Sequence, residues 1–98
     1  MIKITNNMED VELVPNGVAY FTADWCNPCK QLKPQMAKAG IEDDNNVYFV
    51  IDVDKIPSSY LEKYNIKSVP KVFKMTNGII VKEISARTSD EIIKEINS

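Results

Sequence analysis

The sequence predicts an α/β domain in which a mixed sheet of five strands lies between helices. Three observations support this fold class. Two nearly continuous apolar runs, residues 18–23 and 46–53, flank a helical segment, as expected for parallel strands buried on both faces. An Asn-Gly pair joins two further strand-like segments late in the chain. The length suits a single domain over residues 1–98.

The first elements follow from alternation and turn chemistry. Residues 1–5 alternate apolar and polar side chains and predict a short strand. Asn6 or Asn7 caps a brief helix, which the Pro-Asn-Gly turn at 15–17 ends. The buried strand at 18–23 comes next.

The central elements alternate between helix and strand. We expect a helix from about Cys26 to Ala39, stopped by Gly40. The buried strand at 46–53 follows it, and a short helix then begins at Pro57 and runs through Tyr64. Helical crossovers of this kind make the first three strands parallel.

The last elements are a hairpin and a helix. Segments 69–75 and 79–84 flank Asn77-Gly78, whose residues accept the positive φ that a tight turn requires. The hairpin makes the last two strands antiparallel. Thr88 and Glu91 have the spacing of a capping box, and the isoleucines that follow repeat at helical spacing.

Composition excludes several classes of function. The formal net charge of −2 predicts no nucleic-acid partner, and no apolar run approaches the roughly 20 residues of a membrane span. The start of the chain lacks the basic and apolar regions of a signal peptide, so we expect a cytoplasmic protein. Histidine is absent, which excludes Cys–His nucleophiles, Ser–His–Asp triads and histidine metal ligands. We expect a monomer without a cofactor.

Both cysteines lie in "ADWCNPCK", residues 23–30, where a buried strand meets a helix. A helix N-terminus stabilises a thiolate through unpaired N–H groups and a partial positive charge. Cys29 follows Cys26 by three residues, so both lie on one helix face. Pro28 is tolerated in the first helical turn because its missing N–H has no helical partner.

Three interpretations of the cysteine pair compete. Structural zinc needs two more ligands, which without histidine would come from carboxylates or from a second copy of the chain. A structural disulfide is disfavoured by the expected cytoplasmic location and by the shortness of the loop. Redox exchange between thiols and disulfides is therefore favoured, and no metal is expected.

The motif at 23–30 resembles the WCGPCK motif of the thioredoxin family. The resemblance covers nearly the whole chain: Pro34 matches a helix proline of the family, "KYNIKSVPKVF" at 63–73 resembles the segment around its cis-proline, and "TNG" resembles its last hairpin. It implies a thioredoxin fold, with sheet order first, third, second, fourth and fifth strand, about four helices, and a cis Val69–Pro70 bond.

The resemblance also implies roles for site residues. Cys26 would attack a substrate disulfide and Cys29 would resolve the mixed disulfide. Trp25 would shield the site, Val69 would pair its backbone with an extended substrate, and Pro70 would shape the groove.

Other positions near the motif depart from the family or carry charge. Pro28 would keep the pair reducing, whereas Asn27 replaces the family's glycine and belongs to the expected substrate surface. Lys71 stands where the family often has threonine, and we expect it beside the groove. Its charge would offset Asp24 and favour acidic substrates.

Tyr20 stands six residues before Cys26, where thioredoxins usually carry a buried aspartate. The family's nearby lysine falls around Val50, and its late glycine is close to Ser85. A phenol with an ordinary pKa near 10 stays neutral at pH 7 and cannot act as a strong base. Tyr20 would donate a hydrogen bond to the Cys29 thiolate, orient a water, or only fill space in the core. These departures and the short first helix resemble divergent or phage-encoded thioredoxins.

The sequence therefore predicts a protein-disulfide reductase. By family analogy its partners are disulfide-containing proteins, an NADPH-linked thioredoxin reductase as electron donor, and ribonucleotide reductase as an acceptor. Two alternatives remain. One is a glutaredoxin-like enzyme linked to glutathione, although the Gly-Gly segment usual in that family is missing. The other is a binding subunit whose surface matters more than its thiols.

Overall fold

The computed structural model describes all 98 residues and has the expected order of elements. The strands are β1 (Ile2–Ile4), β2 (Gly17–Thr22), β3 (Val47–Asp52), β4 (Lys71–Thr76) and β5 (Ile79–Glu83). The helices are α1 (Met8–Glu12), α2 (Asn27–Glu42), α3 (Ser58–Lys63) and α4 (Ser89–Ile96), and a 3-10 turn, η1, covers Val53–Lys55.

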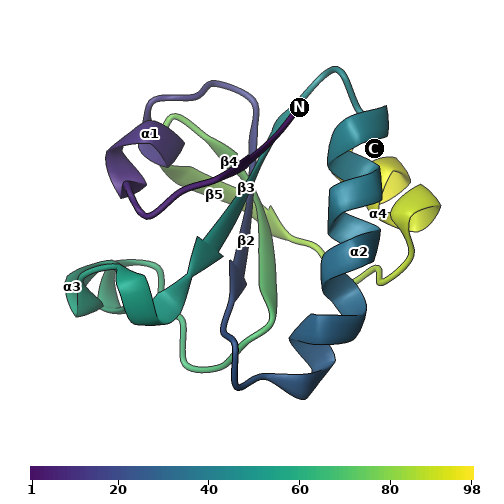
Figure 1. Cartoon of the computed structure of the whole chain (residues 1–98). Helices are drawn as coiled ribbons and strands as arrows, with labels where there is room; N and C mark the ends of the chain where they lie inside the picture. The colour runs from purple at the N-terminus through teal and green to yellow at the C-terminus, as the bar shows by residue number, and fades with distance from the viewer.

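The strands form one sheet in the order β1-β3-β2-β4-β5, which confirms the predicted topology. Strands β1 and β2 run parallel to β3, whereas β4 is antiparallel to both β2 and β5. Helices α1 and α3 lie on one side of the sheet, and α2 and α4 lie on the other (Figure 1). The fold is thus a three-layer α/β sandwich.

Strand β2 is the centre of the core. All six of its residues are buried. Ala19 and Phe21 pack into the cluster beneath α1 and α3, whereas Val18 and Tyr20 pack into the cluster that includes α2 and α4. This alternation is the two-residue period of a strand whose opposite faces are both covered.

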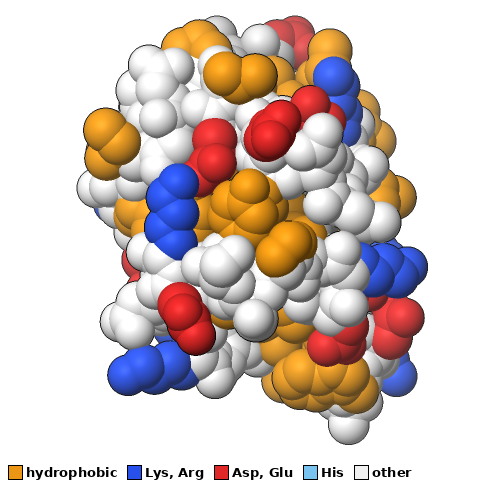
Figure 2. Space-filling model, turned by 90° about the vertical axis from the view of Figure 1, so that its left-hand side faces the viewer, with side chains coloured by type: hydrophobic (Ala, Val, Ile, Leu, Met, Phe, Trp, Pro, Cys, Tyr) orange, Lys and Arg blue, Asp and Glu red, His pale blue; other side chains and the backbone are white.

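The outer surfaces are mixed in character. On the side of α1 and α3, apolar side chains reach the surface in several patches that are interspersed with acidic and basic groups (Figure 2). Such scattered apolar groups are normal for a water-facing surface. No helix combines the length and the apolar character needed to cross a bilayer.

The prediction that Gly40 stops the second helix is wrong, because α2 continues to Glu42 and Asp43 is its C-terminal cap. Gly40 lies where α2 approaches the sheet. A Cβ atom there would come within 2.8 Å of the Ile2 Cβ and 3.2 Å of the Tyr48 Cβ. The glycine therefore allows close packing of helix on sheet and does not end the helix.

The predicted capping box of the last helix is also absent. Thr88 is the N-cap residue of α4, but its side chain makes no capping hydrogen bond. The Ser89 N–H instead donates to Gln35 Oε1 of α2, at 2.9 Å. By contrast, Asn7 caps α1 as expected, and Asn77 and Gly78 have φ values of 50° and 82° in the predicted hairpin turn.

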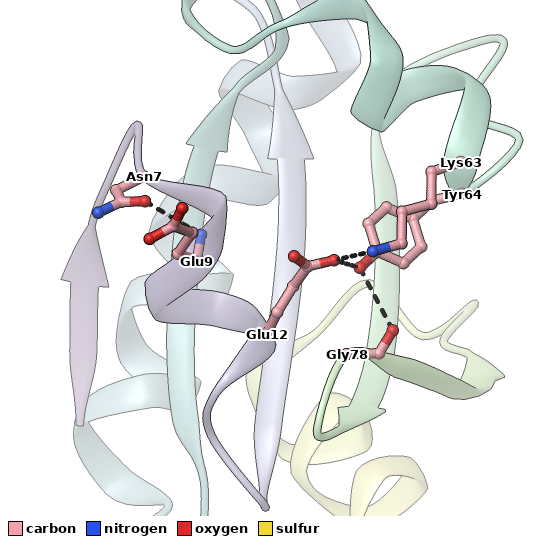
Figure 3. Close-up of polar contacts among 6 residues, drawn as sticks. All are labelled: Asn7, Glu9, Glu12, Lys63, Tyr64 and Gly78. Atoms are coloured by element: carbon pink, nitrogen blue, oxygen red, sulfur yellow. Dashed lines mark hydrogen bonds and ion pairs between the residues drawn. The ribbon is translucent and has the colours of Figure 1, made fainter.

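A polar cluster connects α1 with α3 and the β4–β5 hairpin (Figure 3). The Glu12 carboxylate accepts hydrogen bonds from the Tyr64 hydroxyl and, at 2.6 Å, from the Lys63 ammonium. The same hydroxyl lies 3.3 Å from the Gly78 carbonyl oxygen. Burial raises the pKa of Tyr64, and the hydrogen bond to Glu12 raises it further. The neutral phenol is therefore the stable donor.

A second polar cluster joins the end of α2 to β3 and the end of α4. Asp43 is 3% exposed, and its Oδ2 accepts from the Tyr48 hydroxyl at 2.8 Å and from the Asn46 and Asn97 amides at 3.0 Å. Burial by itself raises the pKa of the Asp43 carboxyl, but these hydrogen bonds outweigh it and leave the pKa below its ordinary value.

The Glu12 cluster predicts a coupling between α1 and α3. Tyr64→Phe should lower the free energy of unfolding by about 1.5–3 kcal/mol, because it removes a hydrogen bond to a charged acceptor. Glu12→Gln combined with Tyr64→Phe should cost less than the sum of the two single changes. Urea unfolding of the four proteins in this cycle measures the coupling. Lys63→Met is the control and should cost about 1 kcal/mol or less, since it removes an exposed ion pair with Glu12 and a cation–π contact with the Tyr64 ring. Additive effects of Glu12→Gln and Tyr64→Phe would refute the coupling.

The Asp43 cluster predicts a loss of stability in acid. Because its folded pKa is depressed, Asp43 contributes stability above the unfolded value of about 3.9, and that stability is lost as the pH falls through the folded pKa. Asp43→Asn should therefore cost about 2–3 kcal/mol at pH 7, and this gap should shrink below about pH 4.

Urea unfolding between pH 2 and pH 7 tests this prediction. Asp44→Asn is a matched control, because Asp44 is the adjacent carboxylate in sequence and is exposed. A gap between wild type and Asp43→Asn that stayed constant down to pH 2 would contradict the assignment.

Candidate active site

The two cysteines lie where β2 delivers the chain to the N-terminus of α2. Cys26 is the N-cap of α2, in an extended conformation with φ −91° and ψ 108°. Its N–H donates to the Ala23 carbonyl at 3.2 Å. Asn27 and Pro28 are the first helical residues and are both exposed. The strand-to-helix junction that the sequence predicted is therefore present.

Cys26 and Cys29 form a disulfide, with Cα atoms 5.3 Å apart. The Cys29 N–H also donates to Cys26 Sγ at 3.2 Å. This donor stands at the positive end of the helix and is aimed at the sulfur that would carry charge in the reduced protein. Cys26 is 4% exposed and Cys29 is 1% exposed, so the second cysteine is the deeper of the two.

The Val69–Pro70 bond is cis, as the family resemblance implied, and lies against the disulfide. The Val69 carbonyl oxygen is 3.6 Å from Cys26 Sγ. The Val69 N–H and C=O take part in no backbone hydrogen bond of the chain, and the residue is partly exposed, so a substrate can reach them. An extended segment placed beside Cys26 would therefore find one donor and one acceptor to pair with.

Trp25 immediately precedes Cys26 and lies at the surface. The residue is 67% exposed, and its Nε1–H donates to Asp54 Oδ2 at 2.8 Å. Asp54 belongs to η1, which begins with a hydrogen bond from the Asp54 N–H to Asp52 Oδ1 at 2.9 Å. Sequence reasoning missed Asp54. Its position just after the carboxyl end of β3, the strand beside β2, was the available signal.

Two depressions flank the cis bond. The first, of about 200 Å³, is mainly apolar and is lined by Trp25, Val53, Asp54, Leu61, Ile66, Lys67, Ser68 and Val69. The second, of about 450 Å³, is lined by both apolar and polar side chains, which are Pro28, Gln31, Leu32, Gln35, Pro70, Arg87 and Thr88. Val69 lines one and Pro70 the other, so the two depressions meet at the peptide bond beside Cys26.

The charged side chains that line the two depressions are Asp54, Lys67 and Arg87. Lys71 does not line either depression, and its ammonium pairs with the Glu83 carboxylate at 3.4 Å. Asp24 is exposed and forms no ion pair. Arg87 lines the larger depression instead. Sequence reasoning missed it, although it is the only arginine in the chain.

Tyr20 lies beneath the active-site helix, but its hydroxyl forms no hydrogen bond with a sulfur atom. The hydroxyl donates to the Cys29 carbonyl oxygen at 3.0 Å, and the side chain is 1% exposed. Burial raises the pKa of Tyr20 further above its ordinary value. Val50, where the family's lysine falls, is buried in the same apolar cluster. Tyr20 therefore anchors the first turn of α2 to β2 as a neutral group.

The site holds no charged residue below the cysteines, and no group of three or more Cys, Asp and Glu side chains is arranged to hold a metal ion. The two sulfur atoms that this protein contributes to the transfer of a disulfide bond are those of Cys26 and Cys29. In the reduced form, this pair can exchange with a disulfide in an extended segment lying across Val69.

Comparison with known proteins agrees with this geometry. A family model described as Thioredoxin matches residues 4–98. Thioredoxin H5 of Arabidopsis thaliana is 29% identical, with 96% of this chain and 76% of that protein covered. A thioredoxin of Chlamydia trachomatis is 25% identical, with 99% and 97% covered. The solution structure of oxidised thioredoxin from Plasmodium falciparum, 25% identical, superposes with a TM-score of 0.81 over 99% of this chain and 96% of that one.

The plant relatives are longer than this chain. It spans 76% of thioredoxin H5 but only 53% of thioredoxin H8 from the same plant, which is 31% identical.

The Tyr20 contact predicts a mainly structural effect of removing its hydroxyl. Tyr20→Phe should lower the free energy of unfolding by about 1 kcal/mol, because the Cys29 carbonyl loses one buried partner. The rate at which Cys29 resolves a mixed disulfide should change little, since the hydroxyl bonds to backbone and not to sulfur. Urea unfolding and the mixed-disulfide lifetime from pH 6 to pH 9 give the two readouts. A collapse of resolution at every pH would show that the hydroxyl takes part in the exchange.

Proposed function

Because this chain belongs to the thioredoxin family, we propose that it reduces disulfide bonds of other proteins by thiol–disulfide exchange through Cys26 and Cys29. The observation that supports this most directly is the Cys26–Cys29 disulfide at the start of α2, beside the unpaired backbone groups of Val69. The structure corresponds to the oxidised end of the cycle.

In the first step, the reduced Cys26 thiolate attacks one sulfur of a substrate disulfide. A bond forms between Cys26 Sγ and that sulfur, the substrate S–S bond breaks, and the second substrate sulfur leaves as a thiolate. The Cys29 N–H and the N-terminus of α2 stabilise the attacking thiolate. Val69 holds the substrate backbone in an extended form across the site, and Trp25 and Pro70 border it.

In the second step, Cys29 loses its proton and attacks Cys26 Sγ. The mixed disulfide breaks, the Cys26–Cys29 disulfide forms, and the substrate leaves with both sulfurs reduced by two electrons in total. The geometry supports this step, because Cys29 is already within bonding reach of Cys26 without any movement of α2.

The proton of Cys29 is taken up without a buried carboxylate. Tyr20 occupies that place, and its raised pKa keeps it protonated, so it is not the base. The thiolate released by the substrate in the first step is a stronger base and is formed next to the cysteine pair. We assign the proton to this group, directly or through a water molecule.

The cycle needs an electron donor. Members of this family act on disulfide substrates and are reduced by thioredoxin reductase, and we propose an NADPH-linked enzyme of that kind for this chain. We propose ribonucleotide reductase as one acceptor. A reducing compartment such as the cytoplasm suits a dithiol that must be returned to its reduced form, and the interspersed surface of the α1–α3 side suits a monomer (Figure 2).

Reduction of insulin disulfides tests the proposal. The wild type should accelerate insulin reduction by dithiothreitol at least tenfold over dithiothreitol alone, and Cys26→Ser should abolish the acceleration because the attacking sulfur is gone. Cys29→Ser should accumulate a mixed disulfide with insulin, since only the resolving step is lost. Mass spectrometry of the acid-quenched mixture detects that adduct. The same assay with NADPH and a thioredoxin reductase tests the proposed donor.

The double variant Cys26→Ser, Cys29→Ser separates exchange from a surface role. The fold should persist, because most of the buried core lies outside the cysteine cluster. Full insulin-reducing activity in this variant would exclude the proposed mechanism. Reduction that proceeds only when glutathione is supplied would favour the glutaredoxin-like alternative.

A further inference from the structure

We propose that Arg87 is a specificity-determining residue that selects protein substrates carrying a carboxylate close to the disulfide, on the Pro70 side of the groove. This inference rests on the proposed function and names the class of protein segment that it acts on. Arg87 takes the place that the sequence assigned to Lys71, whose charge is already paired with Glu83.

Arg87 is one wall of the larger depression beside the active site. Pro28, from the first turn of α2, and Pro70, from the cis bond, line the same depression of about 450 Å³. Both prolines are close in sequence to the residues that a substrate must approach. Pro28 lies between the two cysteines, and Pro70 follows Val69. A substrate segment that passes Val69 on this side therefore meets Arg87.

The backbone on both sides of Arg87 is held in place. The Ser85 and Ala86 N–H groups donate to the Glu95 carboxylate at 3.0–3.3 Å. After Arg87, the Ser89 N–H donates to Gln35 Oε1 at 2.9 Å. The arginine thus stands on a short loop tied to both α4 and α2, so its side chain starts from a fixed point at the rim of the depression.

Most N–H donors of the Arg87 guanidinium form no hydrogen bond within the protein. Nη1 donates to the Ala86 carbonyl at 3.1 Å, and no carboxylate forms an ion pair with Arg87. A guanidinium has five N–H donors, so four remain for a ligand. None of the residues that line the depression is acidic. A carboxylate is the planar acceptor that matches this fork, and the depression offers it no competing negative charge.

The smaller depression, on the other side of the cis bond, carries one charged side chain of each sign. Asp54 already accepts from Trp25, and Lys67 lines the same depression. A carboxylate there would meet Asp54 as well as Lys67, and their charges oppose each other. The preference for acid should therefore be stronger on the Arg87 side of the substrate cysteine than on the other side.

Peptide disulfides test this inference. Each substrate is a short peptide, acetylated and amidated at its ends, that is dimerised through a single cysteine. One glutamate is placed one, two or three residues before or after the cysteine, and each peptide has a glutamine counterpart. The rate constant for oxidation of the fully reduced protein is measured by acid quench and chromatography.

The wild type should reduce the best glutamate peptide about threefold to fivefold faster than its glutamine counterpart at low salt, and the advantage should shrink as salt is added. Arg87→Gln should bring this ratio to about one. Arg87→Glu should invert the ratio. Lys94→Gln is the matched control, because it removes the same charge from an exposed site on α4 that lies outside the groove.

Four results would overturn the inference. The first is equal wild-type rates with glutamate and glutamine peptides, and the second is an equal preference on both sides of the cysteine. The third is an equal effect of Lys94→Gln and Arg87→Gln. The fourth is that Arg87→Gln slows only the reduction of glutathione disulfide and not that of the peptides. The last would assign Arg87 to the carboxylates of glutathione. Failure of the proposed function itself looks different: the wild type would then reduce neither the peptides nor insulin.

Discussion

The burial of β2 on both faces is the constraint on which the rest of the structure depends. Buried backbone groups must be paired, and β2 meets this need with β3 on one side and β4 on the other. Its alternate side chains then require a helical layer above and below the sheet. The chain stays buried to the end of β2, and it reaches the surface at Asp24 and Trp25, directly before Cys26. The active site thus lies where the chain leaving the central strand first becomes exposed to solvent.

The groove is assembled from segments that are far apart in the chain, and two of them are fixed by hydrogen bonds. The turn before α2 is closed by the Cys26 N–H on the Ala23 carbonyl. The loop before α4 is tied through the Ser89 N–H to Gln35. Such preorganisation means that a substrate meets donors and acceptors whose positions are already set, so little ordering is required on binding. The partners then depend on the side chains that this rigid frame presents, and Arg87 is the charged one in the larger depression.

The residues beneath the two cysteines depart from the family pattern, and this departure bears on where the Cys29 proton goes. Tyr20 and Val50 fill the places of a buried carboxylate and an ammonium with one neutral hydroxyl and one apolar side chain. A buried charge is costly unless it is paired, and this chain avoids that cost. The hydroxyl instead holds the Cys29 carbonyl. In the proposed mechanism, the Cys29 proton therefore passes to the substrate thiolate and not to a buried carboxylate.

The sequence by itself determined what depends on neighbouring residues. Two-residue and helical periods defined the strands and helices, and the resemblance around Cys26 and Cys29 indicated the fold, the chemistry and the cis bond. Only the tertiary structure decided that Trp25 bonds to Asp54 and that Arg87, not Lys71, faces the groove. The physical reason is that these are contacts between residues distant in sequence. No local pattern encodes which exposed charge finds a partner, whereas the spacing of apolar side chains records directly which faces must be buried.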